Sequence, residues 1–214
     1  MPKFLLDLLF PIKSLSGKPD VWVDGDDARL LQSDPFCVYP AELRRRGIQS
    51  LDRLVAYSRY DELPLLRTAI HTFKYKRVSS FGEYLGRLLA RASLLLPLDE
   101  QPALCPVPIH WTRQFQRGFN QSRLLAEVVG RTRGWRVLEL LKRTRPTGHQ
   151  AWRARTTRKR AVRNVFSVRS DAQLPPYIVL IDDIATSGAT LDACAYALKE
   201  AGVLRVDALV LAQG

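Results

Sequence analysis

The sequence predicts an α/β fold in which a mostly parallel sheet is covered by helices on both faces. Apolar segments of strand length alternate with longer segments whose apolar residues recur at helical spacing, most clearly after residue 50. The end of the chain reads strand, turn, helix, strand, which is the order of a parallel βαβ unit. With 214 residues and 46% hydrophobic content, the chain can fill the core of one domain of ordinary size.

The first half of the chain begins with an arm. Residues 11–50 contain several Pro and Gly residues and the acidic run DGDD, so we expect irregular structure there. We divide the chain into an N-terminal arm, residues 1–50, and a main domain, residues 51–214. The main domain opens with an expected strand at 51–60 and two expected helices, at 63–76 and 81–96.

The second half continues the alternation. We expect a strand at 103–108, a basic loop at 109–117 and a helix at 120–130. The segment WRVLELL, residues 135–141, fits a strand or a helix by its period, and the alternation around it favours a strand. After a long polar and basic segment come a strand at 177–181, a helix at 190–201 ended by Gly202, and a strand at 205–212.

Targeting and redox signals favour a cytoplasmic protein. The apolar opening is interrupted by Asp7 and ended by Pro11, with no small-residue cleavage site after it, so we expect a short docked helix there and neither a signal peptide nor a membrane anchor. No later segment is long enough to span a membrane. Cys37, Cys105 and Cys194 are far apart and form no CxxC pair, which argues against a disulfide framework. Cys194 is expected in the core.

Positive charge is concentrated in one region. Residues 101–170 hold 16 Lys and Arg but only two acids, whereas the whole chain has a net charge of +12. A surplus of this kind indicates an anionic partner, either a phosphorylated small molecule or a nucleic-acid backbone.

The segment YIVLIDDIATSGATL, residues 177–191, predicts a ligand site. In a parallel sheet, ligands bind beyond the carboxyl ends of the strands, where Asp182 and Asp183 are expected. The small residues after them allow backbone N–H groups and the start of the next helix to surround a phosphate. The carboxylates suit the hydroxyls of a sugar or a Mg²⁺ ion. The ligand described in this way is a sugar phosphate.

The plainer interpretation is that TSGAT only caps a helix and that the two aspartates are solvated residues at the end of a strand. Capping explains a Ser or Thr before a helix. It does not explain the paired Asp residues or the Gly.

These residues resemble a known family. VLIDDIATSGAT is similar to the signature of type I phosphoribosyltransferases, whose ligand is phosphoribosyl pyrophosphate (PRPP). CPVPIHWTRQFQRGFNQSRLLA, residues 105–126, together with AIHTFKYK, residues 69–76, and RPTGHQ…RKRAVRNVFSV, residues 145–168, resembles the ComF (or GntX) subgroup of DNA-uptake competence proteins. The resemblance covers roughly residues 51–214 and the opening LLDLLFP.

The resemblance implies a type I phosphoribosyltransferase-like fold, PRPP and Mg²⁺ as ligands, and a role for each motif. Asp182 and Asp183 would be catalytic, holding the ribose hydroxyls and the Mg²⁺ ion. The 5-phosphate would be held by Ala185, Thr186, Ser187, Gly188, Ala189 and Thr190, and the pyrophosphate would be faced by Pro108, Ile109, Arg113 and Arg117. Catalysis of that kind needs positioning and charge stabilisation more than a protein nucleophile.

Single-stranded DNA is the second partner that the resemblance implies, together with other DNA-uptake or recombination proteins. The candidate nucleic-acid-binding residues are Trp152, Arg153, Arg155, Arg158, Lys159, Arg160 and Arg163. Residues 142–163 also occupy the place of the loop that closes over the leaving group in the family. A solvated loop with no binding role is the plain alternative.

The arm departs from the family pattern. ComF proteins usually carry CxxC pairs that bind zinc there, but only Cys37 is present before residue 51, and His71 is the first histidine. A tetrahedral zinc site needs about four ligands, so we expect no zinc. The three histidines have no metal-binding spacing, and only His110, beside the expected pyrophosphate loop, is a candidate member of the site.

Three functions remain open from the sequence: a competence factor that binds PRPP and single-stranded DNA, a nucleotide-salvage transferase, and a PRPP-sensing module without turnover. The salvage function is disfavoured because no segment for recognising a base can be identified.

Overall fold

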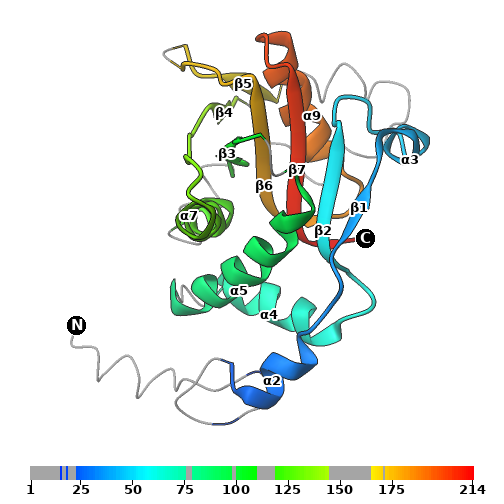
Figure 1. The fold of residues 1–214 in the computed structure, drawn as a ribbon, viewed down its shortest axis with the longest axis vertical. Helices are drawn as coiled ribbons and strands as arrows, with labels where there is room; N and C mark the ends of the chain where they lie inside the picture. The colour runs from blue at the N-terminus through cyan, green and yellow to red at the C-terminus, as the bar shows by residue number, and fades with distance from the viewer. Residues whose placement is uncertain are drawn as a thin grey trace, which may run out of the picture.

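The computed structural model describes residues 15, 18, 23–75, 79–97, 100–109, 119–144, 165–170 and 172–214. Its centre is a five-stranded sheet with the order β1-β2-β7-β6-β3 (Figure 1). Neighbouring strands are parallel except β1 and β2, which are antiparallel. The strands of this sheet are β1 (Phe36–Val38), β2 (Arg53–Arg59), β3 (Ala103–Pro106), β6 (Tyr177–Ala185) and β7 (Arg205–Gln213). The predicted α/β class with a mostly parallel sheet is therefore confirmed.

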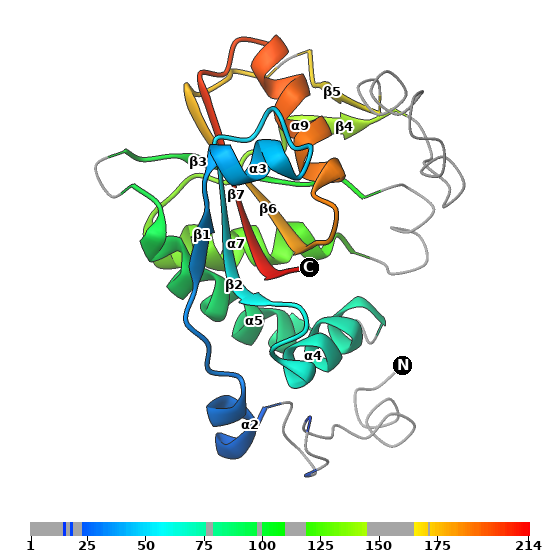
Figure 2. The same cartoon turned by 90° about the vertical axis from the view of Figure 1, so that its right-hand side faces the viewer.

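Helices cover both faces of the sheet and enclose two cores. One core joins the sheet to α4 (Pro64–Tyr75), α5 (Ser79–Ala92) and α7 (Gln121–Arg133). The other joins it to α3 (Pro40–Arg45), α9 (Ala189–Glu200) and a small antiparallel ribbon of β4 (Leu141–Arg143) and β5 (Phe166–Val168). In Figure 2, α5 and α9 lie on opposite sides of the sheet. Alternate residues of the central strands enter opposite cores, as the period of a strand requires.

The arm is more regular than the sequence predicted. It contains helix α2 (Gly25–Leu30), strand β1 and helix α3. The DGDD run that we expected to break structure instead starts α2, because the Asp24 side chain accepts hydrogen bonds from the N–H groups of Asp26 and Asp27. Strand β1 pairs with β2 at the edge of the main sheet. The domain boundary at residue 50 stays a prediction.

Helix α7 continues three residues past its predicted end at Gly130. A Cβ at Gly130 would lie 2.9 Å from the Trp135 carbonyl oxygen and from Val137, so this glycine allows close packing and does not stop the helix. The helix ends at Gly134, which adopts the left-handed conformation with φ 71°. The predicted helix, residues 120–130, was therefore three residues short at its C-terminal end.

The prediction of a strand over residues 135–141 is wrong for most of that segment. Only Val137 bridges to Leu104 of β3, in a parallel arrangement. Two hydrogen bonds fix the bridge, from Leu104 N–H to the Arg136 carbonyl and from Leu138 N–H to the Leu104 carbonyl, at 2.8 Å each. The chain then leaves the sheet edge to form β4, so no longer ladder can develop.

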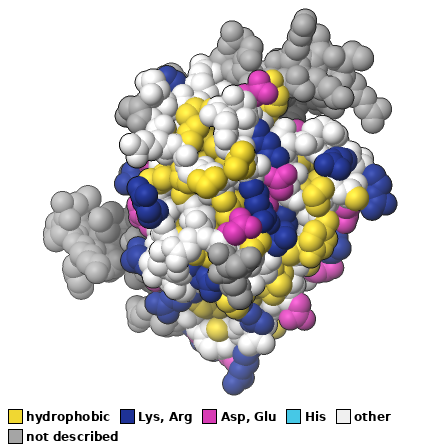
Figure 3. Space-filling model, turned by 45° about the horizontal axis from the view of Figure 1, so that its top comes forward, with side chains coloured by type: hydrophobic (Ala, Val, Ile, Leu, Met, Phe, Trp, Pro, Cys, Tyr) yellow, Lys and Arg dark blue, Asp and Glu magenta, His cyan; other side chains and the backbone are white. Residues whose placement is uncertain are grey.

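The surface carries a few exposed large hydrophobic side chains, namely Leu30, Tyr39, Leu94, Leu95 and Leu204. On the face shown in Figure 3, hydrophobic side chains lie in separate patches among Lys and Arg side chains. Within the described ranges, every helix is too short or too polar to cross a membrane.

Candidate functional site at the carboxyl end of the sheet

The site lies where the chain changes direction in the sheet. From β3 the chain runs through α7 to Val137 on the outer side of β3, whereas from β6 it runs through α9 to β7 on the other side. The two connections therefore diverge from neighbouring parallel strands. Such a switch point leaves a crevice beyond the carboxyl ends of the two strands, which is the usual ligand position in open α/β sheets.

The crevice is a cavity of about 490 Å³. The pairing of the strands explains the shape of the cavity. Strand β3 ends opposite Ile181, whereas β6 continues to Ala185 along β7. Sequence analysis ended β6 at Ile181, so the strand is longer than predicted and both aspartates lie inside its last part. The lining residues are Lys74, Val107, Pro108, Ile109, Gln121, Ser122, Arg143 and the continuous run 182–191.

Asp182 is held from the α7 side. The Ser122 hydroxyl donates to Asp182 Oδ1 at 2.9 Å, and the Asp183 N–H donates to the same oxygen at 2.9 Å. Burial, followed by the neighbouring charge of Asp183, raises the pKa of Asp182 to about 7, against the lowering effect of these hydrogen bonds and of Lys74. This carboxyl group therefore changes charge near neutral pH.

Asp183 has a different partner. Its Oδ1 lies 2.9 Å from Nζ of Lys74, which stands in the last turn of α4. Both side chains are mostly enclosed, with 11% and 20% exposed respectively. The two adjacent acids thus face different environments, one a hydroxyl and one a cation.

The loop after β6 follows the predicted pattern. Gly188 adopts φ +68° and precedes the first turn of α9, whose N–H groups lack an intrahelical acceptor and point toward the cavity end of the helix. Thr186 and Ser187 are exposed, so their hydroxyls are accessible. The Ala185 carbonyl accepts from Gly214 N–H at 2.9 Å, which fixes the start of the loop. All the residues expected to bind the 5-phosphate, 185–190, line the cavity.

The residues expected at the pyrophosphate are brought to the cavity only in part. Pro108 and Ile109 line it. Arg113 and Arg117 lie outside the described residues, as do His110 and the whole predicted nucleic-acid-binding set, Trp152, Arg153, Arg155, Arg158, Lys159, Arg160 and Arg163.

Sequence reasoning missed four polar residues of the cavity: Lys74, Gln121, Ser122 and Arg143. The first three lie inside motifs that were already noted, AIHTFKYK and RGFNQSRLLA, but neither motif indicated contact with the acids. Arg143 comes from β4, and its guanidinium also stacks over Phe166 at 5.4 Å. It belongs to the basic segment 142–163, which was expected as a whole over the leaving group, but nothing in the sequence singled out Arg143.

The start of α7 ties the cavity walls together. The Asn120 side chain accepts from Ser122 N–H at 3.1 Å and donates to the Val107 carbonyl at 3.2 Å. The Gln121 side-chain amide lies 3.5 Å from the Lys74 carbonyl. The loop after β3, the start of α7 and the end of α4 are therefore linked.

A second groove of about 540 Å³ lies on the other side of the loop after β3. Pro108 and Ile109 line both spaces. Lys142 lines the groove, whereas its neighbour Arg143 lines the cavity. Arg123, also in the groove, is paired with Glu127 and Glu139 at 2.9 and 3.1 Å.

Two of the three cysteines are unsuited to nucleophilic chemistry. Cys105 and Cys194 are fully buried in the second core, so the prediction for Cys194 is confirmed. Burial raises the pKa of Cys105 to about 12 and that of Cys194 well above its ordinary value. Among the described residues, no group of three or more His, Cys, Asp or Glu side chains could hold a metal ion.

The fold and the cavity define an α/β protein with a carboxylate pair and a loop that leads into a helix at the switch point of its sheet. No protein-family model matches the chain. Individual proteins of known name are similar to it. The chain is 34% identical over 161 residues to the DNA utilization protein YhgH of Escherichia coli, spanning 72% of this chain and 69% of that protein. It is 30% identical over 176 residues to Competence protein F of Haemophilus influenzae, spanning 77% and 74%.

Competence protein ComFC of Bacillus subtilis matches over a shorter span, with 31% identity over 104 residues, 49% of this chain and 41% of that protein. The chain belongs to the ComF family of competence and DNA utilization proteins.

Proposed function

We propose that this chain is a competence protein of the type I phosphoribosyltransferase superfamily, which binds PRPP with Mg²⁺ in the cytoplasm and handles single-stranded DNA. The observation that carries the proposal is the pairing of Asp182 and Asp183 with the loop 185–190 in one cavity at the switch point. Carboxylates accept hydrogen bonds from sugar hydroxyls, and the start of a twelve-residue helix favours a phosphate. A cavity of about 490 Å³ suits a ligand of this size.

The polar and charged side chains of the cavity would contact different parts of the ligand. Thr186 and Ser187 offer hydroxyls to the 5-phosphate, while Arg143 and Lys74 bring positive charge to an anionic ligand. Lys74 contacts Asp183 in the free protein. A cation bound with the ligand would compete with this ammonium group for the same carboxylate.

The donor set fits Mg²⁺ in the form that this ion usually takes. Two carboxylates are too few for a cage made by the protein alone, and Mg²⁺ commonly keeps waters and shares phosphate oxygens of a bound substrate. Asp182 and Asp183 would hold it, and the ion would neutralise charge on the departing pyrophosphate. The protein's own groups would orient the sugar and exclude water.

The proposal for DNA is supported by charge and by kinship. The net charge of +12 far exceeds what one small ligand requires, and the relatives are named for DNA utilization and competence. The partner would be single-stranded DNA, together with other DNA-uptake or recombination proteins.

PRPP binding is tested by calorimetry with and without Mg²⁺. The double variant Asp182→Asn/Asp183→Asn should weaken binding by roughly a hundredfold or more, since charge-assisted hydrogen bonds are lost. Glu200→Gln, an exposed acid at the far end of α9, is the matched control and should leave affinity unchanged. Equal affinity in the double variant and the wild type would refute the assignment of the site.

Pyrophosphate release separates the competing functions. Release from PRPP with a free purine or pyrimidine would favour a salvage transferase, and release only with single-stranded DNA would favour transfer in DNA handling. Tight PRPP binding without release under any condition would favour a sensing module.

A further inference from the structure

The connection between α3 and β2 contacts the loop at the carboxyl end of β6 directly. Ile48, which is only 4% exposed, packs over Gly188 so closely that a Cβ at position 188 would clash with its side chain. Gly188 is the residue that turns the chain into α9. The arm, which sequence analysis treated as an appendage, therefore forms one wall of the phosphate loop.

A carboxylate completes this contact. Asp192 Oδ1 accepts hydrogen bonds from the N–H groups of Gln49 at 2.8 Å and Ser50 at 2.6 Å. Asp192 stands in the first turn of α9, and its own N–H donates to the Gly188 carbonyl at 2.9 Å. Gly188 is thus enclosed by Ile48 on one side and by a helix turn that is tied to residues 49 and 50 on the other.

The charge of Asp192 makes this arrangement informative. A carboxylate at the start of a helix is favourable by itself, but beside a bound phosphate it would repel the ligand. Here the carboxylate is directed to two backbone N–H groups that lie 143 and 142 residues away in the chain. Its negative charge is therefore stabilised by hydrogen bonds from the arm, and not by groups at the cavity.

We infer that Ile48 and Asp192 are positioning residues for the phosphate ligand, acting by holding the loop 186–190 in the shape that presents its N–H groups. We call this contact the brace. The inference rests on the proposed function for its ligand. It gives the connection 46–50 a role in binding the phosphate ligand. Neither the residue types of this connection nor their positions in the sequence indicate such a role.

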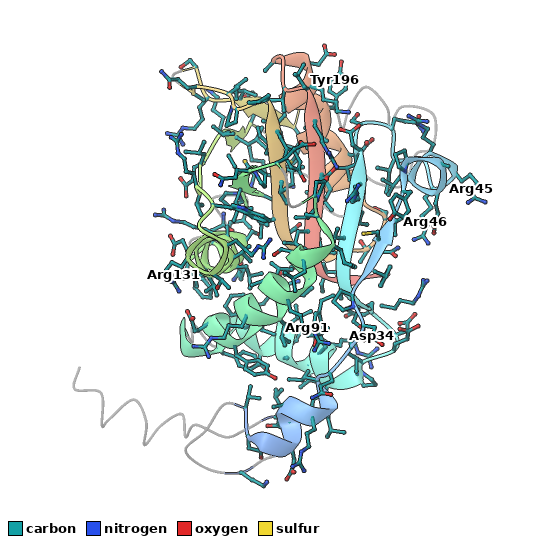
Figure 4. All side chains as sticks on the ribbon, in the orientation of Figure 1. Asp34, Arg45, Arg46, Arg91, Arg131 and Tyr196 are labelled. Carbon is teal, nitrogen blue, oxygen red and sulfur yellow. The ribbon has the colours of Figure 1, made fainter. Side chains whose placement is uncertain are left out.

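Figures 2 and 4 show how the brace reaches the site. In Figure 2, α3 and the connection that follows it lie on the side of the sheet that carries α9. The hydrogen bonds from Gln49 and Ser50 to Asp192 join this connection to the first turn of α9. In Figure 4, Arg45 points away from the sheet on the outer side of α3. Arg45 therefore takes no part in the contact, which depends on Ile48 and on the backbone of residues 49 and 50.

The test uses the full chain with three variants. Asp192→Ala and Ile48→Ala remove the two halves of the brace, and Asp192→Asn keeps an oxygen that can accept the same hydrogen bonds. The matched control is Asp52→Ala, because Asp52 makes a similar tie near the other end of α9, to Lys199 Nζ at 2.7 Å and Val206 N–H at 2.8 Å.

Two measurements decide the inference. Calorimetry should show PRPP affinity reduced about three- to tenfold by Asp192→Ala and Ile48→Ala, because a smaller fraction of molecules holds the competent loop. Asp192→Asn should recover most of the affinity, and Asp52→Ala should lower the melting temperature without changing affinity. Amide hydrogen exchange without ligand should become faster at residues 186–190 in Asp192→Ala but not in Asp52→Ala.

The exchange experiment separates this inference from the proposed function. If the wild type binds no PRPP, the proposed function fails, and faster exchange at 186–190 would still support the brace. If the wild type binds PRPP but Asp192→Ala changes neither affinity nor exchange, the brace is refuted and the proposed function stands. Equal effects of Asp192→Ala and Asp52→Ala on affinity would mean that the brace contributes only to the overall stability of the fold. That result would also overturn the inference.

Discussion

PRPP affinity should rise with pH through neutrality, because Asp182 must give up a proton to bind a sugar diol with its cation. The pKa of Asp182 is raised to about 7. An acid with that pKa is ionised in roughly one tenth of molecules at pH 6 and roughly nine tenths at pH 8. If only the ionised form binds well, affinity should increase by about tenfold between these two values.

The folding stability of the ligand-free protein should change with pH in the opposite direction. The pKa of Asp182 is higher in the folded state than in the unfolded chain, so folding favours the protonated acid. The stability from this group is fully present below the unfolded value near pH 4 and is lost as pH rises through about 7. Raising the pH should therefore weaken the ligand-free fold at this site while it strengthens ligand binding.

Calorimetry at pH 6, 7 and 8 with saturating Mg²⁺ measures the effect. The ligand's own phosphate also titrates near pH 6, so the pH dependence of Asp182→Asn must be subtracted. The difference between wild type and variant should be about tenfold, with proton release visible as a dependence of the heat on buffer. Parallel pH profiles for the two proteins would show that Asp182 does not control binding.

Four further outcomes are expected. Lys74→Met and Arg143→Met should each weaken PRPP binding, because each removes a positive charge from the cavity that takes the anionic ligand; calorimetry of both variants checks the loss. Gly188→Ala should lower PRPP affinity and melting temperature together, owing to its φ of +68° and the clash with Ile48, and adding Ile48→Ala should recover only part of either loss. Elemental analysis should find no stoichiometric zinc, and chelators should leave the melting temperature unchanged. Single-stranded DNA binding should weaken with salt by roughly 0.7 log units per neutralised phosphate for each tenfold rise in salt. A variant with Ala in place of Arg155, Arg158, Lys159 and Arg160 should flatten that slope by roughly two to three units in a gel-shift series. An unchanged slope would show that the basic segment is not part of the DNA site.

The fold was predictable wherever local periodicity and topology agree. Most of the helix and strand order after residue 50 followed from apolar spacing, except for the short strands β4 and β5, and the two acids with the loop 185–190 followed from strand, charge and small residues in one continuous run. Residues 135–141 have a strand-like pattern, but the partner that would extend the ladder is missing beyond the single bridge to Leu104.

The site was predictable only where it is continuous in sequence. Lys74, Ser122 and Arg143 reach the cavity from α4, α7 and β4, and their contacts with it depend on tertiary packing. The brace was missed for the same reason, since Asp192 and Gln49 are 143 residues apart. A polar residue at the start or end of a helix has many plain explanations, and sequence alone offers no means to choose among them.

The short strand β4 has a consequence for how the family can change over time. Lys142 and Arg143 are neighbours in sequence, yet one lines the groove and the other lines the cavity. A single inserted or deleted residue between Val137 and Leu141 would move Arg143 out of its place in the cavity, because a shift by one residue reverses every side chain of a strand. Related chains should therefore tolerate substitutions in this connection much more readily than changes in its length.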